Sequence, residues 1–330
     1  MLKHITFTVL NNLLLMNKLL PKKSKVVVIL GPTSSGKSDT AISLAKRFNG
    51  EIISADSRQV YRDMDLGTGK VSGSWRLITG EIKQKAFYSE GIPHHLLDFR
   101  SPRGDYNVSH FKKDCEKKIK EILSRKKLPI ICGGTGFWID AVVSGVILPE
   151  VKPDLNLRKE LSLCSPEILT KKLQELDSKR ANNIDLKNKV RVIRAIEIAT
   201  KLGEVPEIKK RQHSDFIFLE IGIDWPQNKL DQKIKERLDG RWQSGMILEI
   251  QKLKEFYNLS WEKIQSFGLG YYWIPLFLQK KIDEAELREK VFIAERGYAK
   301  RQKTWFRRNK KIVWENEPSK INTLVEKFKK

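Results

Sequence analysis

The 330-residue chain is long enough for two domains, or for one large domain with an insertion, and its 40% hydrophobic residues suffice for a core. Its formal net charge of +23 favours a polyanionic partner. The alternative is that lysine residues are spread evenly over every surface. A cluster of basic residues in one segment would favour the polyanionic partner over this alternative. The composition excludes a C-x-x-C metal motif, because Cys115, Cys132 and Cys164 are widely spaced, and this favours a reducing cytosol.

The first 20 residues are apolar, but Asn11, Asn12 and Lys18 interrupt them, so they are too short to span a membrane. No small-residue cleavage site precedes the strand that is predicted from Lys25, which disfavours a signal peptide. We interpret residues 1–23 as an N-terminal extension, either amphipathic or lying upstream of a true start at Met16. No other stretch could span a bilayer, so no membrane partner is expected.

Residues 25–30 form an apolar run rich in β-branched residues, as expected of a strand that is buried on both faces. Residues 38–48 have helical spacing. Between them lies a match to G-x-x-x-x-G-K-[ST], the phosphate-binding loop. A chance glycine-lysine-serine loop is the alternative, and the flanking strand and helix disfavour it. The predicted diphosphate-binding residues are Gly31, Pro32, Thr33, Ser34, Ser35, Gly36, Lys37 and Ser38.

Each residue type in this loop has a physical role. Gly31 and Gly36 permit backbone torsions and close approaches that a Cβ would forbid. The loop amides and the helix N-terminus then face an anion. Lys37 adds a point charge for terminal phosphate oxygens, and the Ser38 hydroxyl is placed to bind Mg²⁺. The loop therefore predicts a pyrophosphate group, without specifying a nucleotide.

Residues 51–55 predict a second strand, and Asp56-Ser-Arg-Gln59 follows at once. The active crevice of an open parallel sheet lies outside the carboxyl ends of its strands. Asp56 is therefore a candidate general base or metal ligand, with a helix N-cap as the alternative. Leu66-Gly-Thr-Gly-Lys70 is a second glycine-rich turn, which is a weak signal alone. His94 and His95 lack further metal ligands at suitable spacing, so we interpret them as structural or as hydrogen-bond donors in the crevice.

Residues 107–127 predict an amphipathic helix. Its expected apolar stripe is Val108, Phe111, Cys115, Ile119 and Leu123. Residues 128–132 predict another buried strand, followed by Gly133-Gly-Thr-Gly136 and a helix over 137–143. Glycines at that strand end admit a ligand closely, and Thr135 offers a hydroxyl, which favours a substrate contact over a simple tight turn.

Two prolines within residues 148–153 mark a boundary. Residues 156–201 then have a helical, polar and basic pattern, in which Arg191 and Arg194 would share one helix face. They either bind phosphates or are ordinary surface arginines. Residues 216–222 return to strand. We therefore predict an α/β fold, with a P-loop NTPase-like parallel sheet core in 24–145 and 209–330 and a small helical domain inserted at 146–208.

The region 230–253 predicts a helix with a break near Gly240 or Gly245. Residues 296–308 contain six cations and no acids, with Tyr298, Trp305 and Phe306 interleaved. This cluster favours a polyanionic partner over evenly spread lysines. Phosphate contacts combined with aromatic rings suit a partly unstacked nucleic acid. Aromatic docking in the core, with cations outside, is a compatible alternative.

Together these segments resemble the tRNA dimethylallyltransferase family, or isopentenyl-tRNA transferases, of bacterial type. The matching segments follow the family's order: 31–38, 53–61, 66–70, 94–98, 133–136, 191–197 and 298–307. The resemblance implies transfer of a dimethylallyl group from dimethylallyl diphosphate to N6 of the adenine 3′ of the tRNA anticodon. It also implies Mg²⁺ as cofactor and a cytoplasmic enzyme, for which a monomer suffices to bind one anticodon stem-loop.

The resemblance also implies residue roles. Asp56 matches the family's base, Thr33 a threonine near the diphosphate, and Arg237 an arginine that helps hold the reacting groups. The implied tRNA contacts are Asp56, Ser57, Arg58, Gln59, Thr135, Arg158, Arg191, Arg194, Lys300 and Arg301.

The sequence departs from the family pattern at a few positions. Trp138 stands for the usual tyrosine, Lys187-Asn188 for Asn-Asp, and Ser178 for the proline of Asp-Pro. The zinc-finger extension of eukaryotic relatives is not expected. Two other hypotheses remain. One is a P-loop small-molecule kinase that uses ATP, and the other is a non-catalytic RNA-binding protein with a relic loop.

Overall fold

The computed structural model describes residues 23–78, 85–207, 213 and 215–330. The predicted extension, apart from its last residue, lies outside the described residues. The chain divides into two compact units, Met1–Ser144 with Gln212–Lys330, and Gly145–Arg211. No helix in the described part of either unit is long and apolar enough to cross a membrane.

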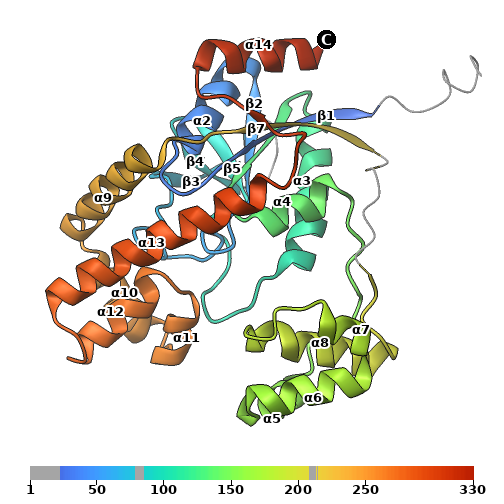
Figure 1. Cartoon of the computed structure of the whole chain (residues 1–330). Helices are drawn as coiled ribbons and strands as arrows, with labels where there is room; N and C mark the ends of the chain where they lie inside the picture. Colours follow the sequence, from blue (N-terminus) through green and yellow to red (C-terminus); the bar gives the residue numbers. More distant parts are fainter. Residues whose placement is uncertain (1–22, 79–84, 208–212, 214) are drawn as a thin grey trace, which may run out of the picture. The chain divides into compact units, whose positions relative to one another are not determined.

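A mixed sheet organises the first unit (Figure 1). Within the described residues it has eight strands in the order β3-β4-β5-β2-β6-β1-β7-β8. The strands from β5 to β8 in this order run parallel, and β3 and β4 form an antiparallel edge. The bounds are β1 Ser24–Leu30, β2 Gly50–Ser54, β3 Ser74–Leu77, β4 Lys85–Ser89, β5 Ile92–His95, β6 Leu128–Gly133, β7 Phe216–Gly222 and β8 Val313–Trp314.

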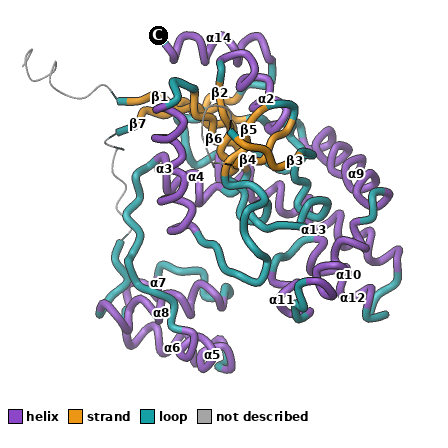
Figure 2. Tube along the Cα trace, turned by 180° about the vertical axis from the view of Figure 1, so that it is seen from behind, coloured by secondary structure: helices purple, strands orange, loops and turns teal. Residues whose placement is uncertain are grey.

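Helices cover both faces of this sheet, as Figure 2 shows from behind. The helices of this unit are α2 Lys37–Phe48, α3 Val108–Ser124, α4 Gly136–Val143, α9 Gln227–Gln243, α10 Met246–Phe256, α11 Trp261–Ser266, α12 Gly270–Leu278, α13 Glu284–Phe306 and α14 Pro318–Lys329.

Successive residues of β1 point into two different cores. Val26 and Val28 pack with α3, α4, α9 and α13, whereas Val27 and Ile29 pack with α2 and α14. Because both faces are covered, every residue in the strand centre is fully buried, which accounts for its uninterrupted apolar run. This arrangement confirms the predicted α/β fold and places the carboxyl ends of the parallel strands at one edge.

The second unit is a small helical bundle with α5 Leu155–Leu163, α6 Pro166–Leu176, α7 Ser178–Asn182 and α8 Lys189–Leu202. Each helix begins where a polar side chain accepts hydrogen bonds from the first backbone N–H groups. The capping residues are Asp154, Ser165, Asp177 and Asn188. Leu161, Leu169, Leu173 and Ile196 form the centre of its core. The predicted helical pattern over 156–201 is confirmed.

The structure confirms two local expectations and adds a sheet edge that the sequence did not predict. The predicted break near Gly240 or Gly245 is confirmed, and it lies at Gly245, whose φ of 92° suits glycine. On α3 the predicted apolar stripe packs against the core, with Val108 and Leu123 partly buried, and Ile122 adds a fully buried residue that was not predicted. The antiparallel edge was not predicted, since the side chains of β3 are all exposed and have no alternating apolar pattern.

A buried carboxylate at the amino end of β2 shows why the paired histidines are structural. Glu51 is fully buried and contacts His95 Nε2 at 2.6 Å, Arg125 Nη2 at 2.7 Å and Lys127 Nζ at 2.9 Å. The adjacent His94 uses Nδ1 to contact the carbonyl of Ile92 at 3.0 Å. Burial would raise the pKa of Glu51, but the hydrogen bonds from His95, Arg125 and Lys127 outweigh it and hold this pKa well below its ordinary value.

We expect Glu51→Gln to destabilise the fold by about 1–3 kcal/mol, because it removes the buried anion that accepts from His95, Arg125 and Lys127. Urea unfolding at pH 7 measures this difference. Since the folded pKa is lowered, the stabilisation is complete above the unfolded pKa of 4.5 and is lost as the pH falls toward the folded value. The gap between wild type and variant should therefore narrow below pH 4.5. An unchanged gap at low pH would contradict this account of the ionised carboxylate.

Candidate active site

A cavity of about 730 Å³ lies at the carboxyl ends of β1 and β2. Its wall combines the loop after β1, the turn after β2, the segment 67–72, one face of α9 and part of α13. The sequence placed only the first two of these together. The residues of α9 and α13 come from segments far along the chain, and they add charged and polar side chains to the cavity.

The loop between β1 and α2 has the shape that phosphate binding needs. A Cβ on Gly31 would lie 2.3 Å from the carbonyl oxygen of Ile223, so only glycine fits there. Gly36 has a φ of 90° and faces open space. Lys37 arches back over the loop, where its Nζ donates to the Pro32 carbonyl at 3.1 Å, and burial lowers its pKa. Lys37 and Ser38 both line the cavity.

Two side chains from later segments hold this loop in place. The amide oxygen of Gln302 accepts from the Thr33 N–H at 2.8 Å, and its Nε2 donates to the Gly134 carbonyl at 2.9 Å. Trp225 Nε1 donates to the Ser35 carbonyl at 2.9 Å. Gln302 thus joins the phosphate loop to the glycine turn after β6. Sequence reasoning did not assign it, although an amide on the Tyr298 face of a cationic helix was an available signal.

Asp56 lines the cavity with one carboxylate oxygen engaged and the other available. Its Oδ1 accepts from the N–H groups of Arg58 at 2.9 Å and Gln59 at 3.4 Å. Its Oδ2 has no hydrogen bond to any residue of the described part of the chain. The capping interaction, which we considered an alternative to function, therefore orients the carboxylate and is compatible with a role as a base.

Arg237 reaches the same cavity from α9. Its Nη1 lies 3.4 Å from Thr33 Oγ1, and its Nη2 donates to the Gly69 carbonyl at 2.6 Å. Burial, followed by the neighbouring Arg241, lowers the pKa of Arg237 to about 10, so the guanidinium is charged at neutral pH. Arg241 pairs with the buried Glu295 at 3.1 Å. The three residues predicted for catalysis, Thr33, Asp56 and Arg237, are therefore brought to one cavity.

Two of the predicted RNA contacts of the first unit, Arg58 and Arg301, lie near Tyr298. The Arg58 guanidinium lies 5.4 Å from its ring centre and that of Arg301 lies 5.9 Å away. Burial raises the pKa of Tyr298 to about 12, so its phenol stays neutral. Ser57 N–H donates to Thr135 Oγ1 at 3.0 Å, which ties the two strand ends together. Lys300 is exposed.

Three further predicted RNA contacts belong to the helical unit. Arg158 pairs with the buried Glu197 through Nε at 2.9 Å and Nη2 at 2.8 Å. Arg194 also pairs with Glu197 and donates to the Val151 carbonyl at 2.8 Å. Arg191 is exposed at the start of α8. Two of these arginines thus also stabilise their own unit, and their contact with RNA remains a prediction.

The donor set suits a cation that brings most of its own ligands. Among the described residues, no group of three or more histidine, cysteine, aspartate or glutamate side chains could hold a metal ion. Ser38 lines the cavity beside Lys37. Mg²⁺ keeps several waters and binds substrate phosphates, so one hydroxyl and a bound diphosphate fit its needs.

The fold and cavity define a P-loop protein whose site is built for a phosphorylated substrate, with a carboxylate and an arginine facing the loop. Comparison with known proteins narrows this class. The model of the IPP transferase family matches residues 59–309, and that of isopentenyl transferases matches residues 24–76. The chain belongs to the IPP transferase family, which confirms the resemblance noted in the sequence.

Relatives and solved structures agree with this assignment. The tRNA dimethylallyltransferase 1 of Syntrophus aciditrophicus is 38% identical over 88% of this chain and 92% of its own. The tRNA dimethylallyltransferase of Acetivibrio thermocellus is 40% identical over 88% of this chain and 91% of its own.

Among solved structures, the full-length tRNA isopentenylpyrophosphate transferase of Bacillus halodurans is 32% identical, with a TM-score of 0.65 over 93% of this chain and 97% of its own. A eukaryotic dimethylallyltransferase acting on tRNA is 26% identical, with a TM-score of 0.63 over 86% of this chain and 70% of its own.

Proposed function

We propose that this protein transfers a dimethylallyl group from dimethylallyl diphosphate to N6 of the adenine 3′ of the anticodon in tRNA and releases diphosphate. One observation carries the proposal. A single cavity, in a chain of the IPP transferase family, joins the phosphate loop to Asp56 and Arg237. A small-molecule kinase would share the loop and a carboxylate, but the relatives are named for prenyl transfer to tRNA.

The cavity suits a reaction in which diphosphate leaves. The bond between C1 of the allyl group and the diphosphate oxygen breaks, and negative charge grows on the diphosphate. The loop amides, Lys37 and Arg237 present positive charge to that group, and preorganised donors of this kind stabilise developing charge. Nothing is hydrolysed, so the site needs no group to position a water molecule.

Asp56 is the proposed base that takes the proton from the adenine amine. The N6 nitrogen forms a bond to C1 and must lose a proton, because an exocyclic adenine amine is a poor nucleophile. The oxygen of Asp56 that makes no hydrogen bond to the described residues can take that proton. The target adenine must leave its stack to enter the cavity. Tyr298 and the Arg58 guanidinium offer surfaces on which a base can stack.

Mg²⁺ is the proposed cofactor, with Ser38 as its protein ligand. When bound, it would add positive charge to the diphosphate oxygens. We propose that the helical unit binds the anticodon stem-loop through Arg158, Arg191 and Arg194. We further propose that the enzyme acts as a monomer in the cytoplasm, where its three free cysteines would stay reduced.

The proposal is tested by incubating the protein with unmodified anticodon stem-loop RNA, Mg²⁺ and dimethylallyl diphosphate. We expect the RNA to gain the mass of one C₅H₈ unit, which fragmentation should localise to the adenine 3′ of the anticodon. An RNA with that adenine replaced by guanine is the matched control and should gain nothing. An unchanged RNA mass, together with ATP-dependent phosphorylation of a small acceptor, would instead support the kinase.

A further inference from the structure

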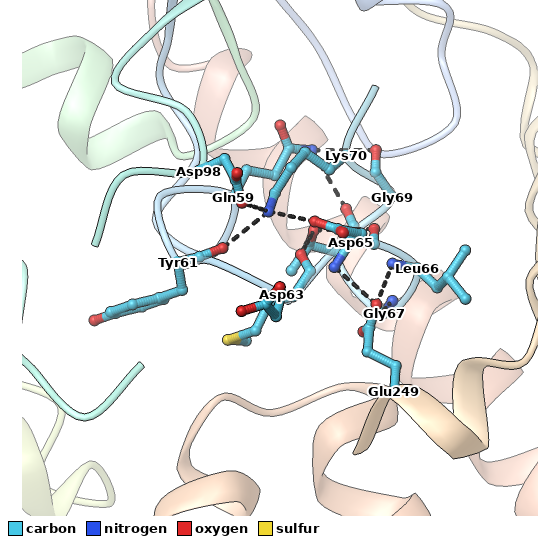
Figure 3. A network of polar contacts seen from close by, with 12 residues as sticks. Gln59, Tyr61, Asp63, Asp65, Leu66, Gly67, Gly69, Lys70, Asp98 and Glu249 are labelled. Carbon is cyan, nitrogen blue, oxygen red and sulfur yellow. Dashed lines mark hydrogen bonds and ion pairs between the residues drawn. The ribbon is translucent and has the colours of Figure 1, made fainter. Parts of the chain in front are cut away.

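A carboxylate outside the cavity organises one of its walls. Glu249, in the first turn of α10, accepts hydrogen bonds from three consecutive backbone N–H groups (Figure 3). Its Oε2 accepts from Asp65 at 2.8 Å and Leu66 at 2.6 Å, and its Oε1 accepts from Gly67 at 3.0 Å. The Tyr271 hydroxyl donates to the same Oε1 at 2.7 Å.

This arrangement is a backbone nest that encloses an anion supplied by the protein itself. Hydrogen bonds to an ionised acceptor are roughly twice as strong as those between neutral groups. All four acceptor contacts of Glu249 are of this kind. The loop is therefore fixed by a side chain that lies more than 180 residues away in the sequence.

A second clamp fixes the other end of the same loop. Lys70 has a side chain that is only 1% exposed, and its Nζ donates to Asp65 at 2.5 Å and Asp98 at 2.6 Å. It also donates to the Tyr61 carbonyl at 2.9 Å (Figure 3). The Lys70 amine is thus occupied by three acceptors of the protein and is not available to bind a substrate. Its glycine-rich sequence context would suggest a phosphate-binding lysine.

Between the two clamps, the loop turns backbone carbonyls toward groups of the cavity. The Gly69 carbonyl accepts from Arg237 Nη2 at 2.6 Å, and Gln59 Nε2 donates to the Thr68 and Gly69 carbonyls at 3.3 and 3.2 Å. A Cβ on Gly69 would lie 2.1 Å from Arg237 Nη2. The guanidinium is therefore packed directly on this backbone, and its position depends on that of the loop.

We propose that Glu249 is a positioning residue for prenyl transfer. By holding the 65–70 loop it fixes the Gly69 carbonyl, and the carbonyl in turn holds Arg237 against the diphosphate. Glu249 does not line the cavity, so it acts through the loop rather than on a substrate. This inference rests on the proposed function for the identity of the reaction, but the coupling between Glu249 and Arg237 is a property of the fold.

Glu249→Gln tests the proposal, because its NH₂ group would face backbone donors in place of one acceptor oxygen. We expect kcat to fall by about 10²-fold, the cost of a small misplacement near the reacting groups. We also expect weaker binding of inorganic diphosphate in calorimetry. Glu255→Gln, at an exposed carboxylate on the same helix, should match the wild type. Tyr271→Phe removes a single contact and should show a smaller loss, which keeps the test open if Glu249→Gln folds poorly.

A double-mutant cycle with Arg237→Ala separates positioning from general stability. If Glu249 acts through Arg237, then Glu249→Gln should cost little further rate or diphosphate affinity in the Arg237→Ala background. Equal losses in both backgrounds would overturn the proposal and assign Glu249 to stability alone. If the wild type binds diphosphate but transfers no prenyl group, the proposed function fails, and the calorimetric cycle still decides whether the two residues are coupled.

Discussion

Asp56→Ala is expected to lower kcat by about 10²–10⁴-fold, the usual contribution of a general base, with near wild-type affinity for the anticodon stem-loop. The expectation follows from the position of the carboxylate in the cavity and from its Oδ2, which no described residue engages. Single-turnover kinetics with saturating donor measures the rate, and a fluorescence titration measures the RNA affinity.

The hydrogen bonds of Asp56 make a second variant necessary. Its Oδ1 also accepts from the N–H groups of Arg58 and Gln59, so alanine removes the base and the cap of this turn together. Asp56→Asn keeps an acceptor oxygen for the turn but cannot take a proton at neutral pH. If the asparagine variant loses as much rate as alanine, proton transfer is the function of Asp56. Parallel losses of rate and RNA affinity in both variants would assign it to recognition.

Sequence reasoning found the parts of the site that are encoded locally. Strand, glycine loop and helix follow one another over residues 24–48, and the apolar run of β1 reports burial on both faces. Asp56 could be placed beside the loop because the ends of neighbouring parallel strands meet at one edge of a sheet. These inferences needed only local pattern and a general rule of topology.

The remaining parts depend on contacts between distant segments. Gln302 reaches the phosphate loop across 269 residues, and Glu249 reaches the 65–70 loop across more than 180. The sequence marks Gln302 only as an amide on the Tyr298 face of its helix, and it indicates the partner of neither residue. Arg237 was found only through the resemblance to a family, since one arginine on a charged helix carries no signal of its own. Tertiary structure is what distinguishes these residues from ordinary surface ones.

The basic residues illustrate the same limit. The cluster of residues 296–308 was expected to bind a polyanion, and its aromatic rings were expected either to stack with bases or to pack in the core. In the structure Phe306 is buried, while Tyr298 lines the cavity and has the guanidiniums of Arg58 and Arg301 near its ring. Core packing of Phe306 is therefore shown, and base stacking by Tyr298 stays a prediction. Charge count alone could not tell which aromatic residue is buried.

Lys37→Ala is expected to lower kcat by about 10²–10³-fold, comparable to the loss of one preorganised donor at a developing charge, and to weaken donor binding as well. Burial lowers the pKa of this amine, whereas a bound diphosphate would favour its charged form. Among the described residues, its Nζ donates only to the Pro32 carbonyl, at 3.1 Å. A bound diphosphate would therefore stabilise the charged form of this amine. The charge on the diphosphate grows as the bond to C1 breaks, so rate and affinity should fall together.

Calorimetry with inorganic diphosphate and single-turnover kinetics measure the two effects of Lys37→Ala separately. Lys113→Ala, at an exposed lysine of α3, is the control for loss of one positive charge and should leave both unchanged. A loss of rate with unchanged diphosphate affinity would show that Lys37 stabilises only the transition state. Unchanged rate and affinity would show that Lys37 does not contribute to the site. The expected joint loss differs from that of Asp56→Ala, which should spare diphosphate binding, because one residue acts on the leaving group and the other on the acceptor.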